Sequence, residues 1–163
     1  MEIKEINVND YLTKSNLPSS DYVINPYIGC SHGCKYCYAS FMKRFTGHKE
    51  KWGDFVDVKR CDKKMSLKKI SKKNVFLSSV TDCYNKLEEK YLITRGILEQ
   101  LVDSDCYLSI STKSKLILRD IDLLKKIKNN RSICQIGFKG DVKNLIDKLI
   151  LLFKFYNVDL GKF

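Results

Sequence analysis

The chain has 163 residues, of which 44% are hydrophobic and 30% charged, a balance that predicts one soluble globular domain and excludes a disordered chain. The formal net charge of +11 favours either an anionic partner or simply a lysine-rich surface. No uncharged apolar run is long enough to span a membrane, and residues 1–20 lack the order of a signal peptide, so we expect a cytoplasmic protein without membrane contact.

The first half of the chain is predicted to contain short elements around a loop over residues 30–37, which holds three cysteines and is called the cysteine loop below. Residues 22–24 form a predicted strand that leads into this loop. A helix over residues 38–44 is predicted to follow it. Residues 47–59 are predicted to form an ordered loop in which Trp52 and Phe55 are the anchors.

The second half alternates between strands and helices. Runs rich in β-branched and aromatic residues predict strands at 74–80, 107–112 and 132–138. Apolar residues at helical spacing predict helices at 86–103, 119–129 and 141–156. On the first of these helices, three residues are expected to face away from the core: Glu88, Glu89 and Arg95.

This alternation predicts an α/β fold with a parallel sheet covered by helices. Ligands of such sheets bind beyond the carboxyl ends of the strands. Three polar segments follow predicted strands, namely the cysteine loop, residues 78–82 and residues 111–114. We therefore expect these three loops to converge on one site.

The densest group of potential metal ligands comprises three cysteines: Cys30, Cys34 and Cys37. Three thiolates can hold an iron–sulfur cluster or zinc and leave a fourth position open, as a catalytic site requires. Gly29 and Gly33 are expected to take positive φ angles and let the backbone approach a bound cluster. Zinc with His32 as a fourth ligand is the alternative, which is disfavoured because four ligands within eight residues would strain a tetrahedral site.

The remaining cysteines lack ligand-like spacing: Cys61, Cys83, Cys106 and Cys134. The total of seven is odd and cytoplasmic thiols stay reduced, so a disulfide framework is disfavoured. Cys106 and Cys134 are expected to be buried. Cys83 is expected near the site, where it either packs or relays a radical. His48 is expected on the surface.

The cysteine spacing, with an aromatic residue at Tyr36, resembles the defining motif of radical S-adenosylmethionine (SAM) enzymes. The flanking segments resemble the subgroup similar to spore photoproduct lyase: residues 25–38, 52–58, 79–82, 112–114 and 118–120. The resemblance covers about residues 20–137 of a single radical SAM-like domain over residues 1–163. It implies a partial TIM-like (β/α) barrel truncated to about four βα units, followed by a divergent C-terminal helix over residues 138–163.

The resemblance implies that Cys30, Cys34 and Cys37 bind three irons of a [4Fe–4S] cluster and that SAM binds the fourth. An electron from a reductant such as flavodoxin or ferredoxin would then cleave SAM to methionine and a 5′-deoxyadenosyl radical. Three residues after the strand at 74–80 are implied to contact the amino group of SAM: Ser79, Thr81 and Asp82. Lys113 is implied to contact its carboxylate. Tyr36 is implied to lie near the adenine.

Two departures from this subgroup stand out. The lyase's hydrogen-donating cysteine is replaced by Ser79, and Cys83 follows Asp82 instead, so thymine-dimer repair by the lyase's own mechanism is not expected. The shortened barrel would leave an open sheet edge for the C-terminal helix, a partner chain or a second copy to cover.

The substrate is left open, with a nucleic acid as one candidate from the basic charge and the subgroup. The run over residues 59–73 holds eight Lys or Arg without an aromatic residue and is expected to be solvated surface. Two alternatives to an enzyme remain. One is a non-catalytic iron–sulfur-binding fragment of an interrupted gene, and the other is a small zinc-binding nucleic-acid module.

Overall fold

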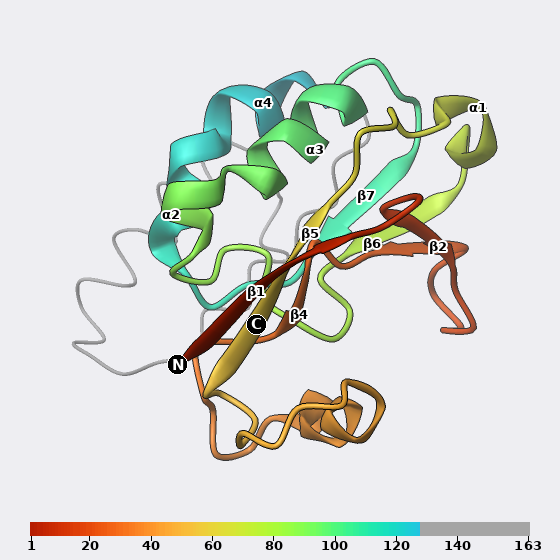
Figure 1. The fold of residues 1–163 in the computed structure, drawn as a ribbon. Coiled ribbons are helices and arrows are strands. Elements are labelled where there is room, and N and C mark those ends of the chain that lie inside the picture. Colours follow the sequence, from red (N-terminus) through yellow and green to blue (C-terminus); the bar gives the residue numbers. More distant parts are fainter. Residues whose placement is uncertain (128–163) are drawn as a thin grey trace, which may run out of the picture.

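A computed structural model of the chain describes residues 1–127 (Figure 1). Its strands are β1 (Glu2–Asn7), β2 (Leu12–Lys14), β3 (Tyr22–Ile24), β4 (Tyr27–Gly29), β5 (Phe55–Arg60), β6 (Asn74–Leu77) and β7 (Tyr107–Ile110). Its helices are η1 (Tyr38–Phe45), α1 (Leu67–Ile70), α2 (Glu88–Tyr91), α3 (Ile93–Leu101), η2 (Lys115–Asp120) and α4 (Ile121–Lys126), where η marks a 3₁₀ helix. The strand expected at 132–138, the helix expected at 141–156 and Cys134 lie outside the described residues.

The strands form two sheets of mixed direction. One has three strands in the order β1-β5-β4, and the other has four in the order β2-β3-β6-β7. The strands β3, β6 and β7 run parallel, as the alternation of strands and helices predicts. The pairs β2·β3 and β4·β5 are antiparallel, which the sequence pattern did not indicate. The fold is therefore a mixed α/β fold with a parallel portion, consistent with a partial radical SAM fold.

Helices α2, α3 and α4 lie together on one side of the strands (Figure 1). The amphipathic face of α3 supplies Ile97, Leu98 and Leu101, which are at most 1% exposed. These side chains belong to one hydrophobic core with buried residues of the parallel strands: Val75, Leu77, Leu108 and Ile110. Burial of this apolar surface is the main force that holds the helices on the sheet. Cys106 is fully buried in the same core, as expected.

The prediction of a loop over residues 47–59 was wrong in its second half, where the chain forms β5. This strand is central in its sheet, paired with β1 on one side and β4 on the other. Val56 and Val58 are fully buried, and β-branched residues favour such a position. The two expected anchors do pack, because Phe55 is fully buried and Trp52 meets its ring edge-on at 5.8 Å.

The single helix expected over residues 86–103 is broken into α2 and α3. Leu92 has φ of 53°, a left-handed conformation that ends one helix and begins the next. The expectation that Glu88 faces solvent was wrong, since Glu88 is fully buried. Its carboxylate accepts hydrogen bonds from the Tyr27 hydroxyl and from Arg119. The helix expected over residues 119–129 begins instead as η2 and continues as α4.

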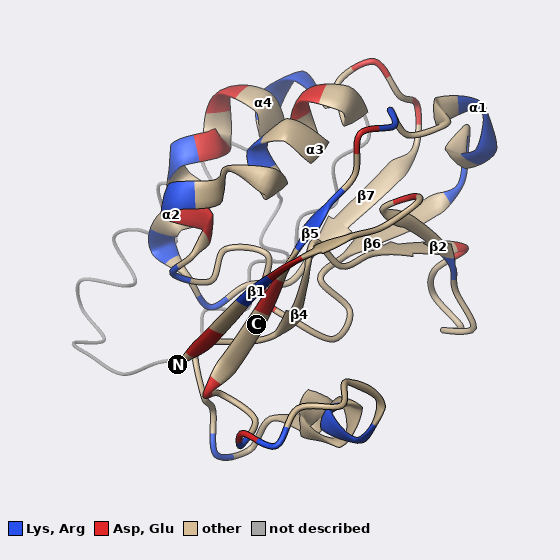
Figure 2. Cartoon of the chain, in the orientation of Figure 1, with Lys and Arg blue, Asp and Glu red and all other residues tan. Residues whose placement is uncertain are grey.

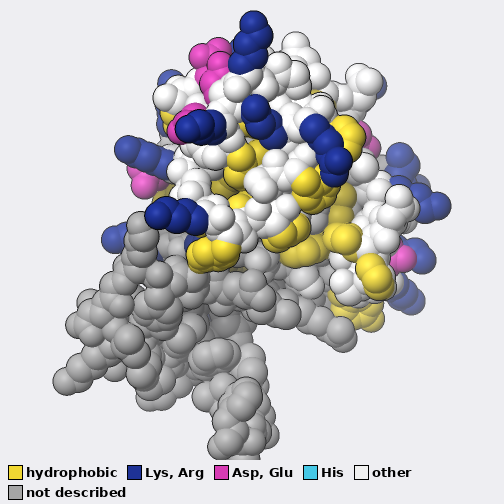
Figure 3. All heavy atoms as spheres, turned by 90° about the horizontal axis from the view of Figure 1, so that it is seen from below, with side chains coloured by type: hydrophobic (Ala, Val, Ile, Leu, Met, Phe, Trp, Pro, Cys, Tyr) yellow, Lys and Arg dark blue, Asp and Glu magenta, His cyan; other side chains and the backbone are white. Residues whose placement is uncertain are grey.

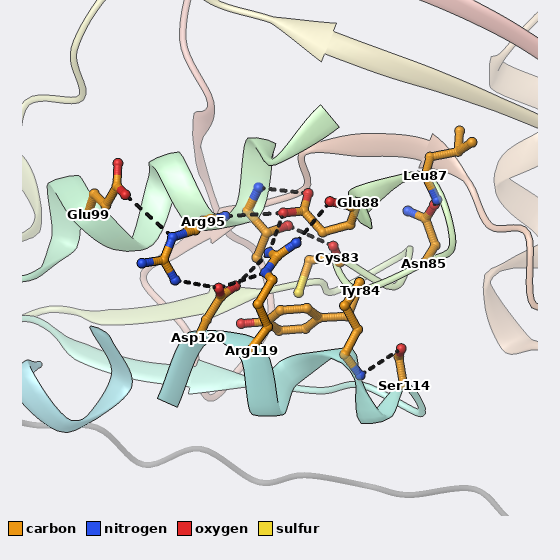
Figure 4. Close-up of polar contacts among 12 residues, drawn as sticks. Cys83, Tyr84, Asn85, Leu87, Glu88, Arg95, Glu99, Ser114, Arg119 and Asp120 are labelled. Atoms are coloured by element: carbon orange, nitrogen blue, oxygen red, sulfur yellow. Dashed lines mark hydrogen bonds and ion pairs between the residues drawn. The ribbon is translucent and has the colours of Figure 1, made fainter. Parts of the chain in front are cut away.

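A network of ion pairs around two buried carboxylates joins the helices (Figure 4). Arg119 lies 2.8 Å from Glu88 and 2.7 Å from Asp120, and Arg95 lies 2.8 Å from Asp120. Both carboxylates are fully buried, a state that is stable only when the charges are paired. Because Tyr27 belongs to β4, the network also fixes the strand that enters the cysteine loop.

The basic run over residues 59–73 covers the end of β5 and α1, where Figure 2 colours stretches of the ribbon as Lys or Arg. Its lysines from Lys63 to Lys73 are all exposed, as expected of a solvated surface. Among residues 1–127, no helix has both the length and the apolar character needed to cross a bilayer.

Candidate functional site

Three loops meet at the carboxyl ends of β4, β6 and β7 around a cavity of about 300 Å³. They are the cysteine loop, residues 78–82 and residues 111–113, so the expected convergence is confirmed. The cavity is lined by seven of the nine predicted site residues: Cys30, Cys34, Tyr36, Cys37, Thr81, Asp82 and Lys113. Ser79 and Cys83 are not among its lining residues.

Glycines let the cysteine loop pass close to β5. Gly29 and Gly33 have φ of +83° and +54°, as expected. A Cβ atom on Gly29 would lie 2.4 Å from the carbonyl oxygen of Phe55, closer than any side chain tolerates. A Cβ atom on Gly53 would lie 2.9 Å from the Cα atom of Gly33. The position of the loop therefore depends on the absence of side chains at Gly29 and Gly53.

The donor set of this loop fits an iron–sulfur cluster. Cys30 is 8% exposed, and Cys34 and Cys37 are half-buried. The residues that the structure describes include no group of three or more Cys, His, Asp or Glu that could hold a single metal ion. A cluster, however, is bound by one thiolate per iron, so its ligands lie farther apart than the ligands of a single ion, and the three cysteines line one cavity.

Cys30 is the most enclosed of the three thiols. Burial raises the pKa of the Cys30 thiol to about 11, although backbone N–H groups of His32 and Asp82 oppose this effect. Binding a metal there would therefore release a proton, because thiolate is the ligand. The same backbone groups could hydrogen-bond a ligating sulfur.

The Asp82 carboxylate joins all three loops. It accepts hydrogen bonds from the Thr112 hydroxyl at 2.7 Å, the Lys113 amide at 2.9 Å and the Tyr84 amide at 2.9 Å. It also lies 3.1 Å from His32 Nε2, in line with the expected role of His32 as a hydrogen-bonding loop residue. Burial alone would raise the pKa of Asp82, but these hydrogen bonds outweigh burial and lower it. The carboxylate is only 6% exposed.

Lys113 reaches from the end of β7 to the cysteine loop. Its ammonium lies 3.2 Å from Cys34 Sγ, 3.1 Å from the Tyr36 hydroxyl and 4.2 Å from the centre of the Tyr36 ring. The hydrogen bond to Tyr36 is the main cause that raises the pKa of Lys113, so the side chain stays charged at neutral pH. The Tyr36 ring is itself 75% exposed.

The other two predicted SAM-binding residues already have partners. Ser79 is 6% exposed, and its hydroxyl accepts a hydrogen bond from Asn25 at 3.0 Å. The Thr81 hydroxyl donates to the Gly29 carbonyl at 2.6 Å. The Tyr38 hydroxyl donates to the Ser79 carbonyl.

Sequence reasoning assigned no role to Asn25 and Tyr38. Asn25 also accepts a hydrogen bond from the Val80 amide at 3.1 Å, so it holds the end of β3 to the loop after β6. Tyr38 lines the cavity. The signal that could have found both is their place at the two ends of the resembling segment over residues 25–38.

The side chains of Cys83 and His48 are both buried and lie outside the lining of the cavity. Cys83 is fully buried in the hydrophobic core, with its backbone amide bonded to the Ser78 hydroxyl at 2.6 Å. The expectation that His48 lies on the surface was wrong, because its side chain is 3% exposed. Its ring stacks on Phe55 at 4.0 Å and lies 2.9 Å from the buried carboxylate of Asp57. A buried carboxylate needs such a partner, and the sequence gives no sign of the pairing.

The radical SAM superfamily model matches residues 24–140. The chain belongs to the radical SAM superfamily. Membership of this superfamily implies a [4Fe–4S] cluster and SAM as cofactors.

Several curated proteins are similar to this radical SAM chain. Uncharacterized protein MJ0683 of Methanocaldococcus jannaschii is 39% identical over 148 residues, which are 90% of this chain and 56% of that protein. Uncharacterized protein ORF301 of Acidianus two-tailed virus is 32% identical over 68% of this chain and 40% of its own. Uncharacterized protein Mb2609c of Mycobacterium bovis is 32% identical over 63% of this chain and 32% of its own length. The chain thus spans about half the length of the first of these relatives and less of the others. No solved structure matches it.

Proposed function

We propose that this chain binds a [4Fe–4S] cluster through Cys30, Cys34 and Cys37 and cleaves SAM reductively to a 5′-deoxyadenosyl radical. When bound, the cluster supplies the electron for that cleavage, received from a donor such as flavodoxin or ferredoxin. One observation carries the proposal: the three cysteines line the same cavity as the polar loops after β6 and β7. Superfamily membership supports it.

We assign the residues of the chain separate tasks in this site. Lys113 offers a charged N–H donor to the SAM carboxylate, since a lysine is a compact partner for such a group. Tyr36, largely exposed at the cavity, offers a ring face to the adenine. Asp82 is saturated by donors of the chain itself, so it positions the loops around the ligand.

The finer resemblance to the spore photoproduct lyase subgroup remains part of the proposal, without the lyase's hydrogen-donating cysteine. Ser79 occupies that position and is bonded to Asn25. Cys83 is fully buried and lies outside the cavity lining. We therefore leave Cys83 out of the proposed catalytic set.

The test is SAM cleavage by protein reconstituted anaerobically with iron and sulfide, reduced, and assayed for 5′-deoxyadenosine. Cys34→Ala should abolish the product. Cys61→Ala, which removes a half-buried cysteine outside the cavity, should leave it unchanged and is the matched control. A loaded cluster without product would instead favour the non-catalytic cluster-binding protein. Zinc in place of iron after anaerobic, iron-rich expression would favour the zinc module.

A nucleic acid is the substrate class that we propose for this site, because aromatic and basic side chains are exposed together beside the cavity. The exposed aromatic residues at the end of the cysteine loop and in η1 are Tyr36, Tyr38, Phe41 and Phe45. The Arg44 guanidinium lies 5.5 and 5.1 Å from the ring centres of the two phenylalanines. On the face seen from below, Figure 3 shows hydrophobic side chains gathered beside Lys and Arg. Stacking on aromatic rings together with phosphate attraction is typical of single-strand binding.

Binding of a fluorescent single-stranded oligonucleotide, followed by anisotropy at several salt concentrations, tests this substrate class. Phe45→Ala should weaken binding about fivefold or more, since stacking contributes about 1–3 kcal/mol per base. Arg44→Gln should weaken binding and reduce the salt slope by about one. Lys68→Gln, on α1, is the control for lost charge alone. Affinity that is independent of salt, or equal in Phe45→Ala and Lys68→Gln, would contradict the assignment.

A further inference from the structure

Lys113 makes a contact that SAM binding does not explain. Its Nζ atom lies 3.2 Å from Cys34 Sγ, within hydrogen-bonding distance for sulfur. The same atom lies 3.1 Å from the Tyr36 hydroxyl. An ammonium has three N–H donors, and these two contacts use two of them. The remaining donor leaves the side chain able to bind an anionic ligand at the same time.

The direction of this lysine is fixed by its backbone. The Lys113 amide donates to Asp82 at 2.9 Å, and the preceding Thr112 hydroxyl donates to the other oxygen of the same carboxylate at 2.7 Å. His32, which lies between Cys30 and Cys34 in the chain, is held by this carboxylate as well, at 3.1 Å. The buried Asp82 therefore fixes the base of Lys113 and the cysteine loop relative to each other.

The three cysteines consequently have different surroundings. Cys30 is buried, and its sulfur faces backbone N–H groups. Cys34 is half-buried, and its sulfur faces the Lys113 ammonium. Hydrogen bonds to cluster sulfurs and nearby charge are two of the means by which a protein sets a cluster's reduction potential. A charged donor has a stronger effect than a neutral one.

We propose that Lys113 raises the reduction potential of the cluster by donating a charged hydrogen bond to the Cys34 thiolate. The positive charge stabilises the reduced cluster, which carries one more negative charge than the oxidised one. This inference rests on the proposed function only in that Cys34 must ligate a cluster. It requires neither SAM cleavage nor any particular substrate.

The test is the midpoint potential of the reconstituted cluster without SAM, measured by a redox titration followed by electron paramagnetic resonance. Lys113→Met should shift the potential to more negative values. Lys113→Arg keeps the charge, so its potential should stay close to that of the wild type. Lys113→Gln keeps a neutral N–H donor and should fall between them. Lys35→Met is the matched control, because Lys35 adjoins Cys34 in the chain and is exposed, so its loss changes the net charge equally.

The inference is overturned if Lys113→Met keeps the wild-type potential or shifts it no more than Lys35→Met does. It is also overturned if both neutral Lys113 variants fail to load a cluster while Lys35→Met loads one, since Lys113 would then act in assembly. A shift in potential in a protein that cleaves no SAM would support the inference while the proposed function fails. SAM cleavage by the wild type, with no difference in potential between wild type and Lys113→Met, would support the proposed function while the inference fails.

Discussion

Gly29, the residue before Cys30, offers a quantitative test of how the cysteine loop is built. Gly29→Ala places a methyl group at φ of +83°, 2.4 Å from the Phe55 carbonyl oxygen and 3.0 Å from its ring. The left-handed conformation costs an L-residue about 1–2 kcal/mol. The overlap with the central strand β5 adds about 1–3 kcal/mol, because backbone atoms have to move. We expect a loss of about 2–5 kcal/mol in the free energy of unfolding.

Gly47→Ala is the control for the first of these contributions. Gly47 has φ of +72°, but a Cβ atom there would meet nothing within 4 Å. It should cost only the conformational part, about 1–2 kcal/mol. Urea denaturation of the two variants and the wild type measures both values from the shift in midpoint at constant slope.

The difference between the two variants isolates the steric contribution at Gly29. We also expect Gly29→Ala to take up less iron on reconstitution than Gly47→Ala, since the displaced backbone leads directly into Cys30. Equal losses of stability in the two alanine variants would refute the reasoning, because the contact with β5 would then contribute nothing.

Three further predictions concern the helices and their charges. Gly96→Ala, in α3 with open space around its Cα, should raise the unfolding free energy by about 0.8–1 kcal/mol in urea denaturation. Glu88→Ala removes the buried acceptor of the Tyr27 hydroxyl, while Arg119 keeps its ion pair with Asp120, and should lower the unfolding free energy by about 1–3 kcal/mol in the same assay. Arg95 holds the pKa of Asp122 below its ordinary value, so this pair stabilises the protein above about pH 4 and is lost as the pH falls. Asp122→Asn should therefore be slightly less stable than wild type at pH 7, and the two should converge in acid, in thermal melts across pH.

Much of the site was visible in the sequence because it depends on local order. The spacing of Cys30, Cys34 and Cys37 and the positive φ angles of Gly29 and Gly33 follow from a single short segment. The convergence of three loops follows from a general property of parallel strands, whose carboxyl ends meet at one edge. These predictions need no knowledge of which side chains touch.

The predictions that were wrong concern features that depend on contacts between distant parts of the chain. The break at Leu92 lies within a continuous apolar periodicity, so the pattern alone predicts one helix. Glu88 is charged and was placed on the surface, but Arg119 and Tyr27 approach from other elements and allow its burial. His48 is buried for the same reason, by Asp57 of β5. A polar side chain reveals its need for a partner, and only the tertiary structure decides whether that partner is water or another residue.

The sequence by itself thus determined the cysteine spacing, the parallel order of β3, β6 and β7 and the family of this radical SAM chain, since each follows from neighbouring residues or from short periodic patterns. The tertiary structure alone decided that Asp82 is saturated by three loops, that Cys83 is sealed in the core and that Lys113 faces Cys34. Those outcomes depend on contacts between residues far apart in the chain. Their energies come from desolvation and hydrogen-bond pairing, which exist only once the distant segments are brought together.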